Sequence, residues 1–190
     1  DLFVIAPTTA NTIAKLANAI ADNILLQCAL AYPHTKILAP SANTNMIENP
    51  ITKANIKMLA IANYEIVETQ TKELACKTTG NGAMAEPINV FWQSARALLK
   101  DEFYVDRKVI ITGGGTIEKI DDVRYLSNFS SGKMARSIAL ISHLCGANVT
   151  LVSTKFDETL PLVIKQYVPP STQEMQNVLN EVTKTTFNAI

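Results

Sequence analysis

The chain has 190 residues, of which 47% are hydrophobic and 18% charged, enough core material for one large or two small domains. Lysine plus arginine and aspartate plus glutamate number 17 each, so no basic field indicates a nucleic-acid partner. No apolar run reaches the roughly 18 residues that cross a bilayer, and no signal peptide is visible. The three cysteines lack zinc or disulfide spacing, and we therefore expect a cytoplasmic protein.

The first half of the chain alternates apolar runs with segments of helical periodicity. The run at 2–5 is expected to be a strand covered on both faces, as in a parallel sheet. A helix capped by Asn11 or Thr12 follows, and its apolar stripe is expected to be buried as far as Cys28. This alternation favours an α/β fold with a doubly wound parallel sheet. The later elements are expected as a strand at 36–39, a helix at 51–62, a strand at 64–67, a loop at 69–84 and a helix at 86–99.

A second unit of the same kind follows a short charged segment. We expect a first domain at 1–100, a linker at 101–107 and a second domain at 108–190. The helix that starts near Ser131 should bury the face carrying Met134, Ile138, Ile141 and Cys145, and Gly146 should end it. The remaining elements are expected as strands at 109–112, 149–152 and 163–168 and a last helix after Pro169-Pro170-Ser171. Strand patterns at both ends of the chain predict a fragment of a larger protein.

Ligands of open α/β sheets bind beyond the carboxyl ends of the strands, where three loops of this chain are expected. The loop at 7–12 offers hydroxyl and N–H groups before a helix, which suits a phosphate or the polar edge of a flavin, although such a turn is more often a plain cap. The loop at 40–46 follows the second strand. The third loop, at 112–133, is long and rich in glycine.

The third loop fits neither common phosphate template. A Walker motif would need glycine at Ser127, and a dinucleotide fingerprint would need its helix to start among the glycines. What remains is a double cradle of Gly113–Gly115 and Ser130–Gly132, which could hold a triphosphate. A long surface loop capped by serine is the alternative interpretation.

Five segments together resemble the bifunctional bacterial enzymes of coenzyme A biosynthesis that join phosphopantothenoylcysteine decarboxylase to phosphopantothenate–cysteine ligase. The segments are Ala6-Pro7-Thr8-Thr9-Ala10-Asn11-Thr12, Pro40-Ser41-Ala42-Asn43-Thr44-Asn45-Met46, Ala75-Cys76 with Gly80, Gly82 and Met84-Ala85-Glu86-Pro87, Gly114-Gly115-Thr116 with Glu118, Ile120-Asp121, Val123 and Arg124, and Ser127-Asn128 with Ser130-Ser131-Gly132-Lys133-Met134. They cover nearly the whole chain, in the family's order.

For the first half, the resemblance implies a flavodoxin-like decarboxylase that uses FMN. Asn43 would orient the substrate carboxylate, and Cys76 would donate a proton as the decarboxylated enethiolate is reduced. Cys28 and Cys145, on apolar helix stripes, are expected to be packing residues. The residues that would face the FMN are Thr9, Ala10, Asn11, Thr12 and Ser41.

For the second half, the resemblance implies a Rossmann-like ligase that activates phosphopantothenate as an acyl-CMP with CTP and Mg²⁺ before cysteine attacks. Asn128 would handle that intermediate, and Gly114, Ser130 and Gly132 would meet the phosphates. Arg124 and Lys133 are charge partners of the nucleotide or members of structural ion pairs. The resemblance also implies homo-oligomers, trimeric or larger for the decarboxylase and dimeric for the ligase, with further site residues before Asp1 and beyond Ile190. No protein metal ligands are expected.

The chain departs from the family pattern at Ala42, Ile47, Lys77, Ala83 and Ala135, and Ala42 leaves space beside Asn43. A second hypothesis is therefore a flavin-binding regulatory protein without turnover. A sugar or dinucleotide enzyme of doubly wound fold is a third, which the failed dinucleotide template disfavours.

Overall fold

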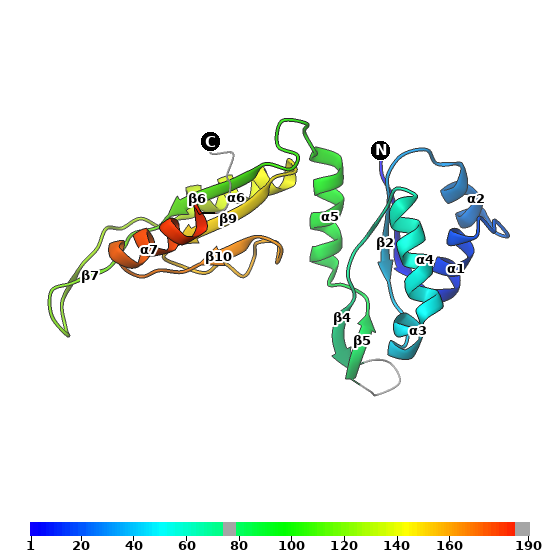
Figure 1. The fold of residues 1–190 in the computed structure, drawn as a ribbon, viewed down its shortest axis with the longest axis horizontal. Coiled ribbons are helices and arrows are strands. Elements are labelled where there is room, and N and C mark those ends of the chain that lie inside the picture. The colour runs from blue at the N-terminus through cyan, green and yellow to red at the C-terminus, as the bar shows by residue number, and fades with distance from the viewer. Residues whose placement is uncertain (74–78, 185–190) are drawn as a thin grey trace. The chain divides into compact units, whose positions relative to one another are not determined.

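A computed structural model describes residues 1–73 and 79–184. The chain divides into two compact units, Asp1–Leu98 and Leu99–Ile190 (Figure 1). Each unit has a three-stranded parallel sheet, and helices connect all of these strands except β9 and β10, which a loop joins. This arrangement confirms the predicted parallel α/β organisation. Within the described residues both sheets keep their strands in chain order, and the first sheet has a core cluster on each face, as a doubly wound fold requires.

The sheet of the first unit consists of β1 (Phe3–Thr8), β2 (Lys36–Pro40) and β3 (Tyr64–Ile66). All five residues of the central strand β2 are buried, with Leu38 in one core cluster and Ile37 and Ala39 in another. The expectation that the first strand is covered on both faces is wrong, because Ile5 is buried whereas its neighbour Val4, which points to the opposite face of β1, is 41% exposed.

Helices cover both faces of the first sheet. The helices α1 (Ala10–Ala17), α2 (Ile24–Ala31) and α4 (Pro50–Ile61) supply the cluster around Leu38, whereas α5 (Pro87–Leu99) supplies the cluster around Ile37 (Figure 1). A short helix α3 (Thr44–Glu48) precedes α4.

The single helix expected to run as far as Cys28 is wrong, since the chain forms two helices there. Ala19 adopts a left-handed φ of 55° between them, and Asn23 caps α2. The break turns the second helix, so that Leu26 and Ala29 are buried while Cys28 is exposed.

The stretch expected as a loop at 69–84 contains an antiparallel hairpin of β4 (Gln70–Glu73) and β5 (Thr79–Ala83). Thr71 pairs with Asn81 and Lys72 pairs with Gly80. Its polar and glycine-containing strands lack the apolar alternation by which a strand is recognised. Ala75, Cys76 and Lys77 lie outside the described residues.

The sheet of the second unit is formed by β6 (Lys108–Gly113), β9 (Asn148–Ser153) and β10 (Lys165–Tyr167), with β9 in the centre. The long loop after β6 contains a two-stranded hairpin of β7 (Glu118–Lys119) and β8 (Tyr125–Leu126). The two helices of the unit are α6 (Lys133–Leu144) and α7 (Thr172–Val182).

The face of α6 that was expected to be buried is the exposed one. Met134 is 79% exposed, whereas Ala135 and Ala139 are buried against the sheet. The reason is close packing, because a Cβ at Gly113 would lie 2.3 Å from the Cβ of Ala135. Only small side chains fit between this helix and β6.

The segment expected as a linker, 101–107, lies in the second unit and contacts its core. The Asp101 N–H donates to the carbonyl of Cys145 at 2.9 Å, and the Asn148 N–H donates to the carbonyl of Arg107 at 2.8 Å. Tyr104 packs against the buried cluster of this unit. In the part of the chain that is described, no helix is both long and apolar enough to span a membrane.

Candidate functional site

The loop after β1 ends in a capped helix. Thr9 is the N-cap of α1, where its Oγ1 accepts from the N–H of Thr12 at 3.3 Å and lies 3.0 Å from the hydroxyl of Thr12. Ala10 and Asn11 occupy the first positions of the helix, whose N–H groups have no acceptor within the helix. This end of α1 therefore offers N–H groups, hydroxyls and a positive helix dipole to an electron-rich ligand.

The loop after β2 lies beside this helix start. The Ser41 N–H donates to the carbonyl of Thr8 at 2.9 Å, which joins the carboxyl ends of β1 and β2. Thr9, Ala10, Asn11, Thr12 and Ser41, the residues proposed from the sequence to face FMN, thus come from two neighbouring loops. Their small side chains and hydrogen-bonding groups fit the polar edge of a flavin ring.

Asn43 follows Ser41 by two residues and caps α3. Its Oδ1 accepts from the N–H of Asn45 at 2.9 Å, and the residue is exposed. Beyond α3 lies a cavity of about 340 Å³, lined in part by Ile47, Ile56 and Asn81. Asn43 therefore stands next to the expected flavin loops and one helical turn from a cavity.

The β4–β5 hairpin contacts the loop that carries Asn43. The Ala42 N–H donates to the carbonyl of Gly82 at 3.0 Å. An ion pair joins Lys72 of β4 to Glu86, which follows β5, and the hydrogen bond from Lys72 lowers the pKa of the Glu86 carboxyl. The predicted proton donor Cys76 belongs to the segment between β4 and β5 and lies outside the described residues.

The two glycine cradles predicted for the second unit come together at the carboxyl ends of β6 and β9. Gly114 and Gly132 both adopt left-handed backbone conformations, with φ of 87° and 71°. A Cβ at Gly132 would lie 3.4 Å from the N atom of Gly114, and a Cβ at Gly114 would lie 2.1 Å from Oγ1 of Thr154. A side chain at Gly114 is blocked by Thr154, a side chain at Gly132 is disfavoured by the left-handed φ, and backbone groups therefore line the site.

Asn128 lies against Gly115, the next residue after Gly114. Its Oδ1 accepts from the N–H of Ser130 at 2.9 Å, and a Cβ at Gly115 would lie 2.3 Å from that oxygen. Of the two roles expected for Arg124, the structure shows the structural ion pair, which it forms with Asp121 at 2.6 Å within the β7–β8 hairpin. Lys133 is exposed at the start of α6, where its N–H donates to Oγ of Ser131 at 3.4 Å.

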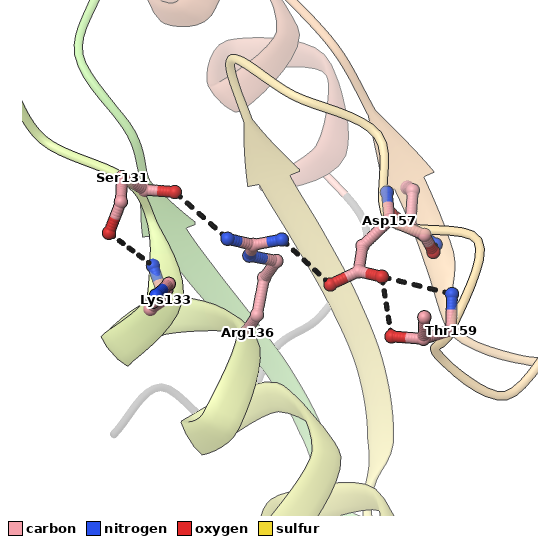
Figure 2. A network of polar contacts seen from close by, with 6 residues as sticks. Ser131, Lys133, Arg136, Asp157 and Thr159 are labelled. Atoms are coloured by element: carbon pink, nitrogen blue, oxygen red, sulfur yellow. Dashed lines mark hydrogen bonds and ion pairs between the residues drawn. The ribbon is translucent and has the colours of Figure 1, made fainter.

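Arg136 is a residue of this site that the sequence interpretation missed. Its guanidinium donates to Oδ2 of Asp157 at 2.9 Å and to the carbonyl of Ser131 at 3.0 Å, as Figure 2 shows. Oδ1 of Asp157 accepts from the N–H and hydroxyl of Thr159. The network joins the start of α6 to the loop after β9. A basic residue in the first turn of a helix is the one signal that could have indicated it.

Glu118, which belongs to a segment that resembles the ligase motif, holds the start of α7 by hydrogen bonds. Its Oε1 accepts from the N–H of Thr172 at 2.8 Å, at the start of α7, and hydrogen bonds from Thr172 lower the pKa of this carboxyl.

Among the residues that the structure describes, no three histidine, cysteine, aspartate or glutamate side chains gather as a metal site.

The two units of the chain match two different protein families. Residues 1–97, just over half of the chain, match the family described as Flavoprotein. The chain belongs to the flavoprotein family. Residues 104–189 match a second family, described as the DNA/pantothenate metabolism flavoprotein C-terminal domain.

Curated relatives of this flavoprotein are longer than the chain. A cysteine/cysteine sulfinic acid decarboxylase of an unknown prokaryotic organism is 40% identical over 80% of the chain and 44% of its own length. The coenzyme A biosynthesis bifunctional protein CoaBC of Bacillus subtilis is 35% identical over 89% of the chain and 42% of its own length, and that of Escherichia coli is 32% identical over 95% and 44%. The chain thus spans less than half the length of these relatives.

Two solved structures match part of the chain. A PPC decarboxylase mutant complexed with pantothenoylaminoethenethiol is 37% identical, with a TM-score of 0.44 over 48% of this chain and 55% of its own. The C-terminal domain of CoaBC is 35% identical, with a TM-score of 0.42 over 46% of this chain and 45% of its own.

The Arg136–Asp157 network predicts a pH-dependent stability of the flavoprotein's second unit. Hydrogen bonds from Thr159, together with Arg136, lower the pKa of Asp157. A carboxyl whose pKa is lower in the folded state stabilises the fold above its unfolded pKa of about 3.9, and this stabilisation is lost as the pH falls. Asp157→Asn should therefore lower the free energy of unfolding by about 1.5–3 kcal/mol at neutral pH, and by progressively less below about pH 4.

Amide hydrogen exchange in β9 and α6 measures this free energy for the second unit alone. Asp122→Asn is the matched control, because Asp122 is exposed in the same unit, and it should change the value by less than about 0.5 kcal/mol. A deficit of Asp157→Asn that is equal at neutral and acidic pH would contradict the proposed charge effect.

Proposed function

We propose that the first unit is a flavodoxin-like, FMN-dependent decarboxylase that converts phosphopantothenoylcysteine to 4'-phosphopantetheine in coenzyme A biosynthesis. The observation that carries the proposal is the hydrogen bond from Ser41 to the Thr8 carbonyl, which brings the expected flavin loop beside the loop of Asn43. The resemblance of both loops to the decarboxylase motifs supports it, as do relatives named as decarboxylases and as coenzyme A biosynthesis proteins.

In this proposal the chain's own residues bind and orient the substrate. Bound FMN supplies the oxidising power that converts the cysteine thiol of the substrate to a thiocarbonyl, conjugated to the carbon that loses CO2. The exposed amide of Asn43 hydrogen-bonds the substrate carboxylate and holds it near the flavin loops. Cys76 donates a proton to the decarboxylated product.

We propose a second activity for the second unit, as a Rossmann-like ligase that couples phosphopantothenate to cysteine with CTP. The meeting of Gly114 with Gly132 beside Asn128 favours it, because backbone N–H groups at a helix start suit a triphosphate. Mg²⁺ would arrive with the CTP. We further propose homo-oligomers, a trimer or larger assembly through the decarboxylase unit and a dimer through the ligase unit.

The decisive experiment measures CO2 release by the protein as the cell produces it, loaded with FMN and kept free of oxygen. With phosphopantothenoylcysteine, the wild-type protein should turn over many times. Cys76→Ser should release CO2 only in proportion to its bound flavin, because without the proton donor the flavin stays reduced. Absorbance of the flavin records that state directly.

Two controls separate the alternatives. Free cysteine replaces phosphopantothenoylcysteine in a parallel assay, since one relative is named as a cysteine decarboxylase. If the wild-type protein binds FMN but releases no CO2 from either compound, the enzyme proposal is wrong and the flavin-binding regulatory hypothesis is favoured. The ligase proposal is tested separately, by CTP-dependent consumption of phosphopantothenate and cysteine.

A further inference from the structure

The β4–β5 hairpin meets the Asn43 loop through two glycines. Gly80 pairs with Lys72, whereas Gly82 lies at the register shift of β5 and has no paired residue in β4, and both glycines contact residues 42–44. A Cβ at Gly82 would lie 2.1 Å from the carbonyl oxygen of Ala42 and 3.1 Å from the N atom of Thr44. A Cβ at Gly80 would lie 1.9 Å from Oγ1 of Thr44. The two glycines therefore allow an approach that no other residue type permits without displacement.

This approach holds the backbone on both sides of Asn43. The Ala42 N–H donates to the Gly82 carbonyl at 3.0 Å on one side, and Thr44 contacts Gly80 on the other. The Thr44 hydroxyl is buried at this contact and has no hydrogen-bond partner among the described residues. Asn43 is thus the residue between two fixed neighbours.

We propose that Gly80 and Gly82 are positioning residues, which hold the amide of Asn43 at the start of α3 in the orientation that recognises the substrate carboxylate. This inference rests on the proposed decarboxylase function. The glycines themselves need not touch the substrate. They act because side chains at positions 80 and 82 would displace residues 42–44, and a displacement near 1 Å costs a reaction roughly 100-fold in rate.

The first test combines a rate with a measurement that is independent of activity. Gly82→Ala should raise amide hydrogen exchange in the segment 42–47, and should lower kcat for CO2 release by roughly 10- to 100-fold with FMN still bound. Thr71→Ala is the matched control, because Thr71 lies on the same hairpin with an exposed side chain, and both quantities should stay at the wild-type values.

A second pair of variants separates positioning from a general loss of stability. The obstacle at Gly80 is a side-chain oxygen, whereas the obstacle at Gly82 is backbone. Thr44→Ala removes that oxygen. Relative to Thr44→Ala alone, adding Gly80→Ala should therefore change exchange and kcat by less than about threefold, whereas adding Gly82→Ala should still cost roughly 10- to 100-fold.

The outcomes distinguish this inference from the proposed function. If Gly82→Ala has wild-type exchange in 42–47, or if Thr44→Ala fails to relieve Gly80→Ala, the positioning role is wrong even when the wild-type protein releases CO2. If the wild-type protein releases no CO2, the decarboxylase function is wrong. The exchange measurements then still decide whether the two glycines hold the loop, and unchanged exchange overturns that too.

Discussion

Asn43→Asp is expected to lower the rate of CO2 release by roughly 100- to 1000-fold while α3 stays folded. An aspartate oxygen can accept the hydrogen bond from the Asn45 N–H that Oδ1 of Asn43 accepts now. The substitution changes an attraction to the substrate carboxylate into a repulsion. The amide can donate to a carboxylate, whereas a second carboxylate repels it. Assays over a range of substrate concentrations should show a raised KM together with a lowered kcat.

The chain contains a matched control for this substitution. Asn49 caps α4 in the same manner, with its Oδ1 accepting from the Ile51 N–H at 2.9 Å, and it is also exposed. Asn49→Asp makes the same chemical change six residues away and should keep the wild-type rate. Equal losses in the two variants, or none in Asn43→Asp, would show that Asn43 does not recognise the carboxylate.

Gly115→Ala is expected to lower CTP-dependent coupling by roughly 10- to 100-fold. The new Cβ would lie 2.3 Å from Oδ1 of Asn128 and 2.9 Å from its carbonyl oxygen. Rotation of the side chain relieves only the first contact, so the backbone at Asn128 must move. The hydrogen bond to Ser130 would then be lost together with the position of the amide. Coupling is measured as the consumption of CTP that depends on both phosphopantothenate and cysteine.

Gly146→Ala controls for the effect of a glycine replacement on stability in the same unit. Gly146 has a φ of 118°, which an alanine adopts only with strain of about 1–3 kcal/mol. It follows α6 and lies next to Val105, away from the glycine cradle. Gly146→Ala should therefore lower the unfolding temperature but keep the coupling rate below that temperature. A coupling loss as large as that of Gly115→Ala would mean that stability, and not the position of Asn128, is responsible.

The sequence was sufficient to predict the parallel α/β order because apolar runs and helical stripes mark strands and crossovers. The sequence was not sufficient where contacts between distant parts of the chain determine which residues are buried or paired. Burial of α6 is one case, since Ala135 and not Met134 faces the sheet. Hydrophobicity predicts the larger side chain to be inside, and only the proximity of Gly113 shows why the smaller one is. The β4–β5 hairpin is another case, because its strands have no apolar alternation.

For the candidate sites, too, some features could be predicted from the sequence and others could not. The loops that carry Thr9 and Asn43 could be located from motifs, since each follows a recognisable strand. The contact between Gly82 and Ala42 could not, because residues forty apart in the chain meet only after the hairpin folds back. Arg136 was missed for a similar reason. Its partner Asp157 lies beyond a whole strand, so the sequence around Arg136 does not indicate that these two side chains meet.

The chain order of the strands has a consequence for how the protein is made. In each sheet every new strand pairs with the one synthesised before it, from β1 to β2 to β3 and from β6 to β9 to β10. For these strands, a nascent chain can therefore add one strand at a time, and none of the described strands has to be inserted between two earlier ones. Among the described strands, each newly made strand presents the edge on which the next one pairs. The strand that pairs with this edge is thus the next strand of that sheet to leave the ribosome.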